Sequence, residues 1–307
     1  MAKPQDLREI DRKKFKEFLD SFDVILTDCD GVIWFLSTPI EGAIETLNLL
    51  KTLGKKIFFV SNNSLSTVEQ YCQKLESSGF QATPNQIIIP AKVIAWYLKK
   101  LNFDGEVFTI GSTPFQKVLK DSGIKLADSP PLSVMEELST VREQISDRPS
   151  IKAVVCDFDL DCNWIKLTRA ILSLQKQNTI FLMGAQDKFV PFSKNVALLG
   201  PGPLTNIVTE LSGRNPIPCA KPSKVLKDFI LEQCEINDPK RCLFIGDSPD
   251  SDMQFGTMCN FQKLFVESGT GRLEECTKCA EITPDYYLPE LSLLLPVLRQ
   301  FLEPSRN

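Results

Sequence analysis

Hydrophobic positions along the chain fall into short β-branched runs that alternate with longer stretches of helical spacing. Runs such as Val24–Thr27 and Lys56–Val60 have the length and composition of buried strands. Between them, Ala43, Ile44 and Leu47 recur at the intervals that place side chains on one face of a helix. Strands that alternate with amphipathic helices are typical of a parallel sheet joined by crossover connections. The pattern therefore predicts an α/β fold.

The alternation returns near the C-terminus, where Ser223 precedes a helical stretch and residues 242–245 form an apolar run. We expect the two ends of the chain, 1–95 and 206–307, to complete one sheet. The region between them, 96–205, has enough elements of its own for a separate domain inserted into the core. Its expected elements are strands at 107–110, 153–156 and 179–183 and a helix at 166–174.

Local signals suggest where individual elements begin and end. Ser66 and Glu69 have the spacing of a capping box, and Gly79 is placed to end the helix that they begin. The segment 127–148 holds several prolines, serines and acids, so we expect a surface connection there.

Length, composition and charge suit two globular domains and exclude some functions. The chain has 307 residues, of which 43% are hydrophobic and 24% are charged. The formal net charge is −4 and no basic block stands out, so we expect no nucleic-acid partner. Residues 1–20 are crowded with charges, and no apolar run is long enough to span a bilayer. We therefore expect a cytoplasmic protein with no membrane partner.

Ten cysteines and the absence of histidine narrow the possible chemistry. The cysteines lack the regular pairing of a disulfide framework, so we expect free thiols in a reducing compartment. Cys276 and Cys279 form a single C-x-x-C pair, with no second pair and no histidine to complete a zinc site. Without histidine, neither a Ser-His-Asp nor a Cys-His mechanism is available. In an enzyme of this composition, carboxylates must carry the covalent and proton chemistry.

Polar residues follow the expected strands at the carboxyl ends, where parallel sheets bind ligands. A D-x-D pair by itself is weak evidence, because acids at strand ends often form turns. Acids, a hydroxyl, amides and a lysine at corresponding strand ends favour one shared site. The candidates are Asp28 and Asp30 after the first strand, Ser61, Asn62 and Asn63 after the second, Lys221 before the Ser223-capped helix, and Asp247 and Asp252 after the late strand.

These residue types suit phosphoryl transfer. A phosphate ester is negatively charged, so a carboxylate can approach it only when cations neutralise both groups. Asp28 and Asp247 offer the oxygen ligands that Mg²⁺ prefers, and Lys221 adds a second positive charge. Ser61 and the amides beside it lie close to a helix N-terminus, where phosphate oxygens are favoured.

The two acids of the D-x-D pair can then take different roles. Asp28 can attack phosphorus and form an aspartyl phosphate, which divides the hydrolysis into two easier steps. Asp30 can protonate the leaving oxygen and later take a proton from water, provided that burial raises its pKa. A halide leaving group needs no such acid, so Asp30 argues against a dehalogenase. Transfer to an acceptor other than water stays open.

Four short motifs, in this order along the chain, resemble those of the haloacid-dehalogenase phosphatases. They are Asp28-Cys29-Asp30-Gly31-Val32-Ile33-Trp34, Phe59-Val60-Ser61-Asn62-Asn63-Ser64, Lys221-Pro222-Ser223 and Gly246-Asp247. The chain is similar above all to the branch of 4-nitrophenylphosphatases, phosphoglycolate phosphatases and pyridoxal-phosphate phosphatases. The likeness runs from about residue 20 to about residue 285.

The resemblance implies a Rossmann-like, doubly wound core with an inserted α/β cap of the C2 type. It implies a magnesium-dependent phosphatase that acts on a small phosphorylated metabolite, such as phosphoglycolate, or on a phosphoprotein, and that can form a homodimer through the cap. It makes Asp28 the nucleophile and a metal ligand, and Asp30 the acid/base with its backbone carbonyl on Mg²⁺. It further assigns Asp247 and, from behind it, Asp252 to the metal, and Ser61, Asn62, Asn63 and Lys221 to the phosphate.

The chain departs from the family pattern mainly in the region that would meet the substrate. Lys221 follows Ala220 where relatives usually have glycine, and Asp157 stands where glycine is common. In the cap loop we consider Asp187 as a substrate contact, with a solvated loop acid as the alternative. Val190 stands where some pyridoxal-phosphate-handling members place histidine, which argues against that substrate.

Other conspicuous residues have simpler interpretations. We interpret Trp34 and Trp164 as packing groups, Asp250 as a turn residue and Lys224 as an exposed residue of its helix. The altered cap loop also leaves an alternative for the whole chain, namely a phosphatase-like protein that uses the cap as a binding module. A binding scaffold has no need for several acids around one site, which favours the enzyme.

Overall fold

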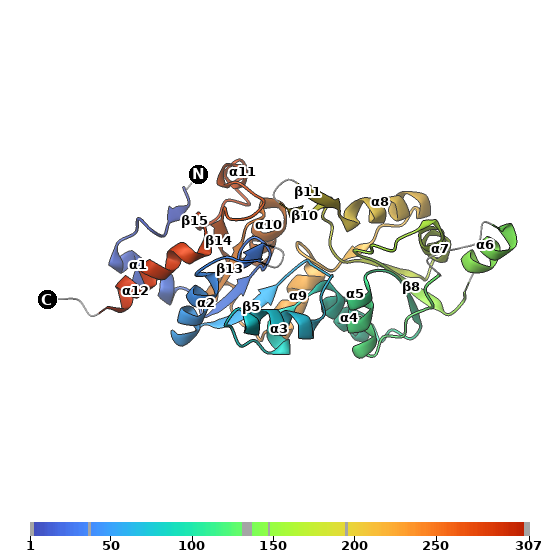
Figure 1. The fold of residues 1–307 in the computed structure, drawn as a ribbon, viewed down its shortest axis with the longest axis horizontal. Coiled ribbons are helices and arrows are strands. Elements are labelled where there is room, and N and C mark those ends of the chain that lie inside the picture. The colour runs from blue at the N-terminus through green and yellow to red at the C-terminus, as the bar shows by residue number, and fades with distance from the viewer. Residues whose placement is uncertain (1–2, 36–37, 131–136, 147, 194–195, 304–307) are drawn as a thin grey trace.

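Two parallel sheets, each with its own helices, lie end to end in the computed structural model. The structure describes residues 3–35, 38–130, 137–146, 148–193 and 196–303. Helices α1 (Arg12–Asp20) and α12 (Leu294–Leu302) lie at the end formed by the first sheet, and α6 (Leu138–Ile145) lies at the opposite end (Figure 1). Among the described residues, none of the helices has the length and apolar character needed to cross a bilayer.

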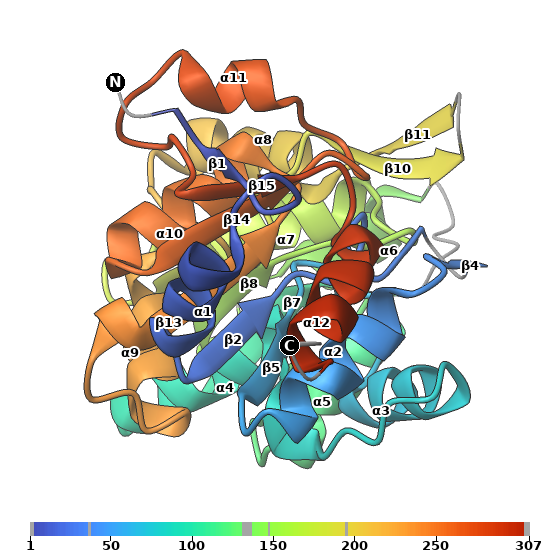
Figure 2. The same ribbon diagram turned by 90° about the vertical axis from the view of Figure 1, so that its left-hand side faces the viewer.

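The first sheet has seven parallel strands in the order β1-β15-β14-β13-β2-β5-β6. The chain winds outward in one direction from β2 and in the other from β13, so the sheet is doubly wound and reverses between these two neighbours. Helices α2 and α3 cover one face, and α9 and α10 cover the other (Figure 2). The strands are β1 (Gln5–Asp6), β2 (Val24–Thr27), β5 (Lys56–Val60), β6 (Ile87–Ile88), β13 (Cys242–Gly246), β14 (Gln262–Val266) and β15 (Tyr286–Leu288), and the helices are α1 (Arg12–Asp20), α2 (Ala43–Thr52), α3 (Val68–Ser77), α4 (Pro90–Lys100), α9 (Lys224–Gln233), α10 (Gln254–Cys259), α11 (Leu273–Thr277) and α12 (Leu294–Leu302).

Burial on both faces explains the unbroken apolar runs of the central strands. Every residue of β13 is buried, as are Ile25 and Leu26 of β2. Phe244 on β13 meets Phe255 of α10 edge to face, with ring centroids 5.6 Å apart. These contacts hold the ends of β2 and β13 side by side, which fixes where the polar residues after them lie.

The second sheet has four parallel strands in the order β12-β9-β8-β7. Ala153 and Val155 of β8 face the larger core, which continues from the first sheet, whereas Val154 and Cys156 face a separate core formed with α7. The chain boundaries expected at 95 and 205 fall inside α4 and α8, and β12 pairs with β9 of the second sheet. The strands are β7 (Glu106–Ile110), β8 (Ile151–Cys156), β9 (Ile180–Met183) and β12 (Ile217–Pro218), and the helices are α5 (Thr113–Asp121), α6 (Leu138–Ile145), α7 (Trp164–Leu174) and α8 (Pro201–Ser212).

Two antiparallel hairpins and a few short turns complete the described chain. The hairpins pair β3 with β4 and β10 with β11. Their strands are β3 (Trp34–Phe35), β4 (Thr38–Pro39), β10 (Phe189–Ser193) and β11 (Val196–Leu199), and the turns are 3₁₀ at η1 (Pro84–Gln86), η2 (Pro239–Arg241) and η4 (Leu291–Leu293) and π-helical at η3 (Pro249–Met253).

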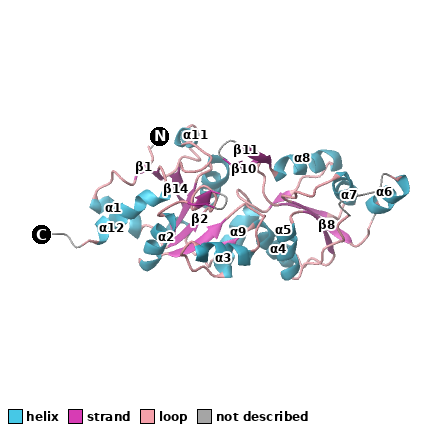
Figure 3. Ribbon diagram, viewed as in Figure 1, coloured by secondary structure: helices cyan, strands magenta, loops and turns pink. Residues whose placement is uncertain are grey.

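The expected surface connection at 127–148 contains a helix that the sequence analysis missed. Helix α6 occupies part of it and stands away from the sheets (Figure 3). No residue of α6 is buried, so the surface location is correct for this part. Residues 131–136 and 147 of the segment lie outside the described residues.

The expected capping box of α3 is wrong by one residue. Thr67, not Ser66, is the N-cap, and its hydroxyl accepts from the backbone N–H of Gln70 at 3.3 Å. The side chain of Gln70 accepts in return from the Thr67 N–H at 2.8 Å. Both S/T-x-x-E/Q pairs are present in the sequence, and burial of Val68 in the core agrees with the register of the second.

We expect Thr67→Val to lower the free energy of unfolding by about 1 kcal/mol, because it removes the hydroxyl acceptor and keeps the side-chain volume. Ser66→Ala is the matched control and should change stability by less than about 0.5 kcal/mol. Chemical denaturation of both variants measures the difference, and equal losses would contradict the observed cap.

Candidate active site

The candidate residues meet where the winding of the first sheet reverses. Asp28 follows β2, Asp247 follows β13, and Ser61 follows β5 on the other side of β2. Ligands of open α/β sheets bind at this position, because neighbouring crossover connections leave in opposite directions there. All three side chains are buried.

Lys221 lies between the strand ends, with only 2% of its surface exposed. Its ammonium group is 2.6 Å from Asp28 Oδ1 and 2.8 Å from Asp252 Oδ1. It also donates to the Val60 carbonyl at 2.9 Å. Burial alone would lower the pKa of Lys221, but the two ion pairs outweigh it and hold the pKa above its ordinary value. The lysine is therefore a fixed positive charge.

The carboxylates around Lys221 are crowded and desolvated. One oxygen each from Asp28, Asp247 and Asp252 lies within 4.8 Å of the others. Burial raises the pKa of Asp28 well above its ordinary value, against the opposing effect of Lys221. Burial, together with the charge of Asp252, raises the pKa of Asp247 to about 6. Three acids share one ammonium group, so this cluster carries excess negative charge whenever the acids are ionised.

Asp252 and Thr270 hold the loop after β13 in place. Asp252 Oδ2 accepts from the backbone N–H groups of Asp247 and Ser248 at 3.0 and 3.1 Å. Thr270 donates to Asp247 Oδ2 from its backbone N–H at 2.6 Å and from its hydroxyl at 3.1 Å. The sequence analysis missed Thr270, which comes from the loop after β14. Asp250 is exposed in η3 and takes no part in this arrangement.

Asp30 is held from both sides of its carboxylate. The indole N–H of Trp34 donates to Oδ1 at 3.1 Å, and the Asn63 side-chain amide donates to Oδ2 at 3.4 Å. Burial raises the pKa of Asp30, with Lys74 as the main opposing influence. Trp34 is fully buried, as expected for a packing group, but that interpretation was incomplete because its polar edge orients a catalytic candidate.

Gly31 permits the close approach of the two acidic loops. Its φ is +84°, and a Cβ atom there would lie 2.7 Å from Asp247 Oδ2. A larger residue would meet both backbone strain and a clash with Asp247. Backbone conformation and the space beside Asp247 therefore explain why glycine occupies this position of the first motif.

Asn62 connects the second motif to the third. Its side-chain carbonyl accepts from the Lys221 backbone N–H at 2.9 Å, and its amide donates to the Lys221 carbonyl at 3.1 Å. The Asn62 side chain thus fixes the backbone that carries the central lysine. Phosphate binding by Asn62 stays a prediction, since both ends of its amide contact Lys221.

The second sheet and its helices form the region expected to be the cap, and the loop after β9 extends from this region toward the site. Burial raises the pKa of Asp187 above its ordinary value, and the charges of Lys221 and Asp252 also act on it. The structure therefore brings Asp187 within electrostatic range of Lys221 and Asp252. Ser112, the N-cap of α5, donates to the Ser64 carbonyl of the first-sheet region at 2.6 Å.

Asp157 lies behind this loop and is almost completely buried. It accepts from the backbone N–H groups of Phe158 at 2.5 Å and Ala185 at 3.3 Å. Burial raises the pKa of Asp157 to about 7. Asp157 thus supports, from inside the cap, the loop that carries Asp187.

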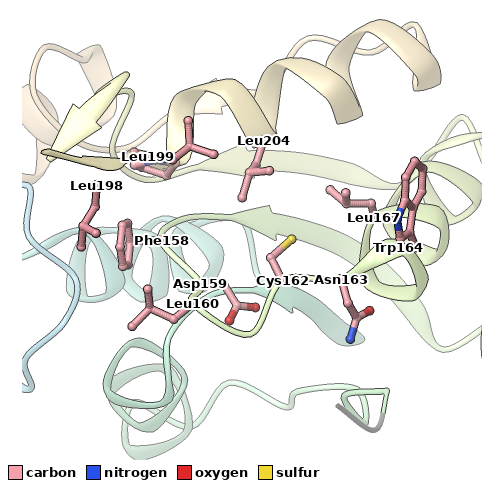
Figure 4. Close-up of a pocket in the computed structure, with 12 residues that line it drawn as sticks. Phe158, Asp159, Leu160, Cys162, Asn163, Trp164, Leu167, Leu198, Leu199 and Leu204 are labelled. Atoms are coloured by element: carbon pink, nitrogen blue, oxygen red, sulfur yellow. The ribbon is translucent and has the colours of Figure 1, made fainter. Parts of the chain in front are cut away.

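A hollow of about 420 Å³ lies elsewhere in the cap, between the loop after β8 and the start of α8 (Figure 4). Its walls are mainly apolar, with Phe158, Leu167 and Leu204 among them. Trp164, at its edge, is 85% exposed, so the expectation that Trp164 is a packing group is wrong. None of the motif residues lines the hollow, which separates it from the chemistry at the strand ends.

The acidic cluster fits a divalent cation. Asp28, Asp247 and Asp252 present oxygen atoms within reach of one ion, and Mg²⁺ prefers oxygen ligands. Among the described residues, Lys221 is the cation that contacts this cluster, and one ammonium group does not balance three carboxylates. Both the type of donor and the charge therefore suit a metal ion.

Comparison with known proteins gives the same class of enzyme. The model of haloacid dehalogenase-like hydrolases matches residues 25–125, and a HAD-hydrolase-like model matches residues 218–294. The 4-nitrophenylphosphatase of Schizosaccharomyces pombe is 35% identical over 288 residues, which cover 92% of this chain and 96% of the relative. The p-nitrophenyl phosphatase from Archaeoglobus fulgidus has the same fold, with a TM-score of 0.76 at 23% identity over 90% of this chain and 99% of that one. A glycerol phosphate phosphatase from Mycobacterium tuberculosis, solved in complex with magnesium, has a TM-score of 0.73 at 21% identity over 90% and 77% of the two chains.

The chain therefore belongs to the haloacid dehalogenase-like hydrolase family. Within that family it is an enzyme of the phosphatase class.

We expect Lys221→Met to lower the free energy of unfolding by about 3–5 kcal/mol in metal-free buffer, because it leaves buried carboxylates without their cation. The loss should be larger at about pH 8 than at about pH 5. Acids whose folded-state pKa is raised destabilise the fold as they ionise with rising pH.

Chemical denaturation in EDTA at the two pH values measures this effect. Lys224→Met, on the exposed first turn of α9, is the matched control and should cost less than about 0.5 kcal/mol. A loss that is equally small in both variants would mean that Lys221 does not neutralise the cluster.

Proposed function

We propose that this phosphatase is a magnesium-dependent phosphomonoester hydrolase that works through an aspartyl phosphate on Asp28. The observation that carries the proposal is the cluster of three buried carboxylates, two of which, Asp28 and Asp252, pair with the ammonium group of Lys221. A binding module, the alternative considered from the sequence, gains nothing from desolvated acids held this close together. A carboxylate nucleophile beside fixed positive charge is what phosphoryl transfer requires.

Phosphate binding falls to residues at the carboxyl ends of β5 and β2. Ser61 offers its hydroxyl and Asn63 the side-chain N–H that does not face Asp30, while Lys221 supplies charge. Asn62 contributes by holding the Lys221 backbone. These groups are in place before substrate arrives, so little reorganisation is needed when it binds.

Asp28 and Asp30 divide the covalent and proton steps. Asp28 attacks phosphorus, the ester P–O bond breaks, and the leaving oxygen takes a proton from Asp30. Asp30 then removes a proton from the water that attacks the aspartyl phosphate, which restores both acids. Its raised pKa suits the first role, and the donors Trp34 and Asn63 keep the carboxylate aimed.

A metal ion would be held by Asp28 and Asp247, with Asp252 behind them and the backbone carbonyl of Asp30 as a further ligand. When bound, Mg²⁺ supplies positive charge that offsets the repulsion between carboxylates and phosphate.

The substrate that we propose is a small phosphorylated metabolite. Asp187 lies within electrostatic range of Lys221 and can accept hydrogen bonds from hydroxyl groups of the leaving alcohol. This favours polyol esters such as glycerol phosphate over esters that carry a carboxylate, such as phosphoglycolate, because a carboxylate would repel Asp187. A phosphoprotein would fit less well, because Asp187 lies close enough to Lys221 and Asp252 for their charges to act on it.

We further propose a cytoplasmic homodimer that pairs through the cap. Seven of the ten free thiols are buried, which suits a reducing compartment. Large apolar side chains are exposed on the cap, and a second copy of this chain would cover them. Leu160, Trp164 and Leu199 line the hollow, and Ile207 and Leu211 lie on α8, which begins at it.

Release of p-nitrophenol from p-nitrophenyl phosphate tests the proposed reaction. We expect turnover with Mg²⁺, none in EDTA, and a loss of at least about a thousandfold in Asp28→Asn, because the nucleophile is gone. Asp250→Asn, in the exposed part of the same acidic region, is the matched control and should keep wild-type turnover. Equal activity of Asp28→Asn and the control would refute an aspartyl-phosphate mechanism.

Asp30→Asn should slow different esters to different extents. With glycerol phosphate, kcat/KM should fall roughly 10²–10⁴-fold, because an alkoxide needs a proton in order to leave. With p-nitrophenyl phosphate the fall should be much smaller, since nitrophenolate leaves without one. Because kcat/KM reports the first phosphoryl transfer, an equal fall for both esters would rule out Asp30 as the general acid.

A further inference from the structure

The hydroxyl of Tyr71 contacts Ser61, the residue directly after β5. Tyr71 lies in α3, is almost completely buried, and its hydroxyl is 2.9 Å from Ser61 Oγ and 3.2 Å from the Asn63 carbonyl. The backbone N–H of Asn63 donates to the same Ser61 oxygen at 3.1 Å. The helical pattern of the sequence places Tyr71 on the core face, and the structure adds the contact of its hydroxyl with a site residue.

The hydrogen bonds around Ser61 restrict the direction of its own proton. A serine hydroxyl has one hydrogen and two lone pairs. When Asn63 N–H and Tyr71 O–H both donate to Ser61 Oγ, both lone pairs are filled and the Ser61 hydrogen is left for another acceptor. Burial keeps the pKa of Tyr71 well above its ordinary value, so the phenol retains the proton that it donates.

A second hydrogen arrangement exists when no acceptor faces Ser61. Tyr71 can donate to the Asn63 carbonyl, and Ser61 can then turn its hydrogen inward onto the Tyr71 oxygen. A phosphate dianion only accepts hydrogen bonds, so its arrival favours the arrangement in which Ser61 donates outward. The position of the Tyr71 proton therefore depends on occupancy of the phosphate site.

We propose that Tyr71 is a positioning residue for phosphate binding, which acts by donating to Ser61 Oγ and so makes Ser61 a donor to the substrate phosphate. This inference rests on the proposed function, because it requires Ser61 to face a phosphate group. The Tyr71 ring is fixed against the buried Trp34, with centroids 6.3 Å apart, so its hydroxyl is held under Ser61 by packing.

Tyr71→Phe tests the inference because it removes the hydroxyl and keeps the ring. We expect KM for p-nitrophenyl phosphate and the inhibition constant for inorganic phosphate to rise by about 3- to 10-fold, with kcat changed by less than about twofold. Tyr286→Phe is the matched control. Its hydroxyl lies 3.5 Å from Gln262, and Tyr286 begins β15, so it sits at the end of the sheet opposite the site.

A double-mutant cycle with Ser61→Ala separates positioning from a general structural effect. If Tyr71 acts through Ser61, Tyr71→Phe adds no further rise in either constant when Ser61 is already alanine. A rise of the same size in both backgrounds, or unchanged constants in the single variant, would overturn the proposal. A loss confined to kcat would overturn it as well.

The same variants distinguish a wrong role for Tyr71 from a wrong proposed function. Inactivity of the wild-type protein with Mg²⁺ would count against the proposed function alone. The rise in unfolding temperature on addition of inorganic phosphate then still reports binding without turnover. It should be smaller in Tyr71→Phe than in the wild type and in Tyr286→Phe. The unfolding temperature without phosphate measures separately what each variant costs the fold.

Discussion

The ion pairs of Lys221 with Asp28 and Asp252 are the interaction on which the rest of the site depends. Each buried carboxylate costs several kcal/mol in desolvation unless a charge and hydrogen bonds compensate it. One ammonium group compensates only part of that cost, and the donors from Thr270 and the loop after β13 supply another part. The remaining excess of negative charge attracts a cation, and a bound cation together with Lys221 would offset the repulsion between the carboxylates and a phosphate. Asn62, directly after Ser61 at the end of β5, hydrogen-bonds to the backbone of Lys221 and so fixes the position of the lysine relative to β5.

The parts of this arrangement that local pattern controls could be predicted. Apolar runs predicted β2, β5 and β13 of the first sheet and β7, β8 and β9 of the second, and residues directly after strands had to converge at one edge. Asp28, Ser61 and Asp247 are of this kind, whereas Lys221 was selected because it precedes the Ser223-capped helix. The structure brings Asp28, Asp247 and Lys221 together. Thr270 could not be found in this way, because no local signal shows that its loop folds back onto Asp247.

Other differences arose where the sequence carries two equivalent signals and tertiary contacts choose between them. Ser66 and Thr67 both begin a sequence that fits a capping box, and the packing of the following residues decides for Thr67. The short strand Ile217–Pro218 has no pattern of its own, and only its pairing with β9 assigns it to the second sheet. The sequence predicted that the rings of Trp34 and Tyr71 are buried, and they are. The hydrogen bonds of the Trp34 indole N–H and the Tyr71 hydroxyl could not be predicted, because their partners come close only in the folded protein.

The bond between Asn62 and Lys221 also bears on how such an enzyme can diversify. It connects the loop after β5 with the segment before α9. Along the chain, these two parts of the first-sheet region lie before and after the second sheet. All the acids of the proposed chemistry, and the lysine, belong to the first-sheet region. Asp187 is the candidate residue that the second-sheet region contributes. Loops of the second sheet can therefore change length and composition during evolution while the reaction centre keeps its geometry. New substrates are accessible to this architecture without a new mechanism.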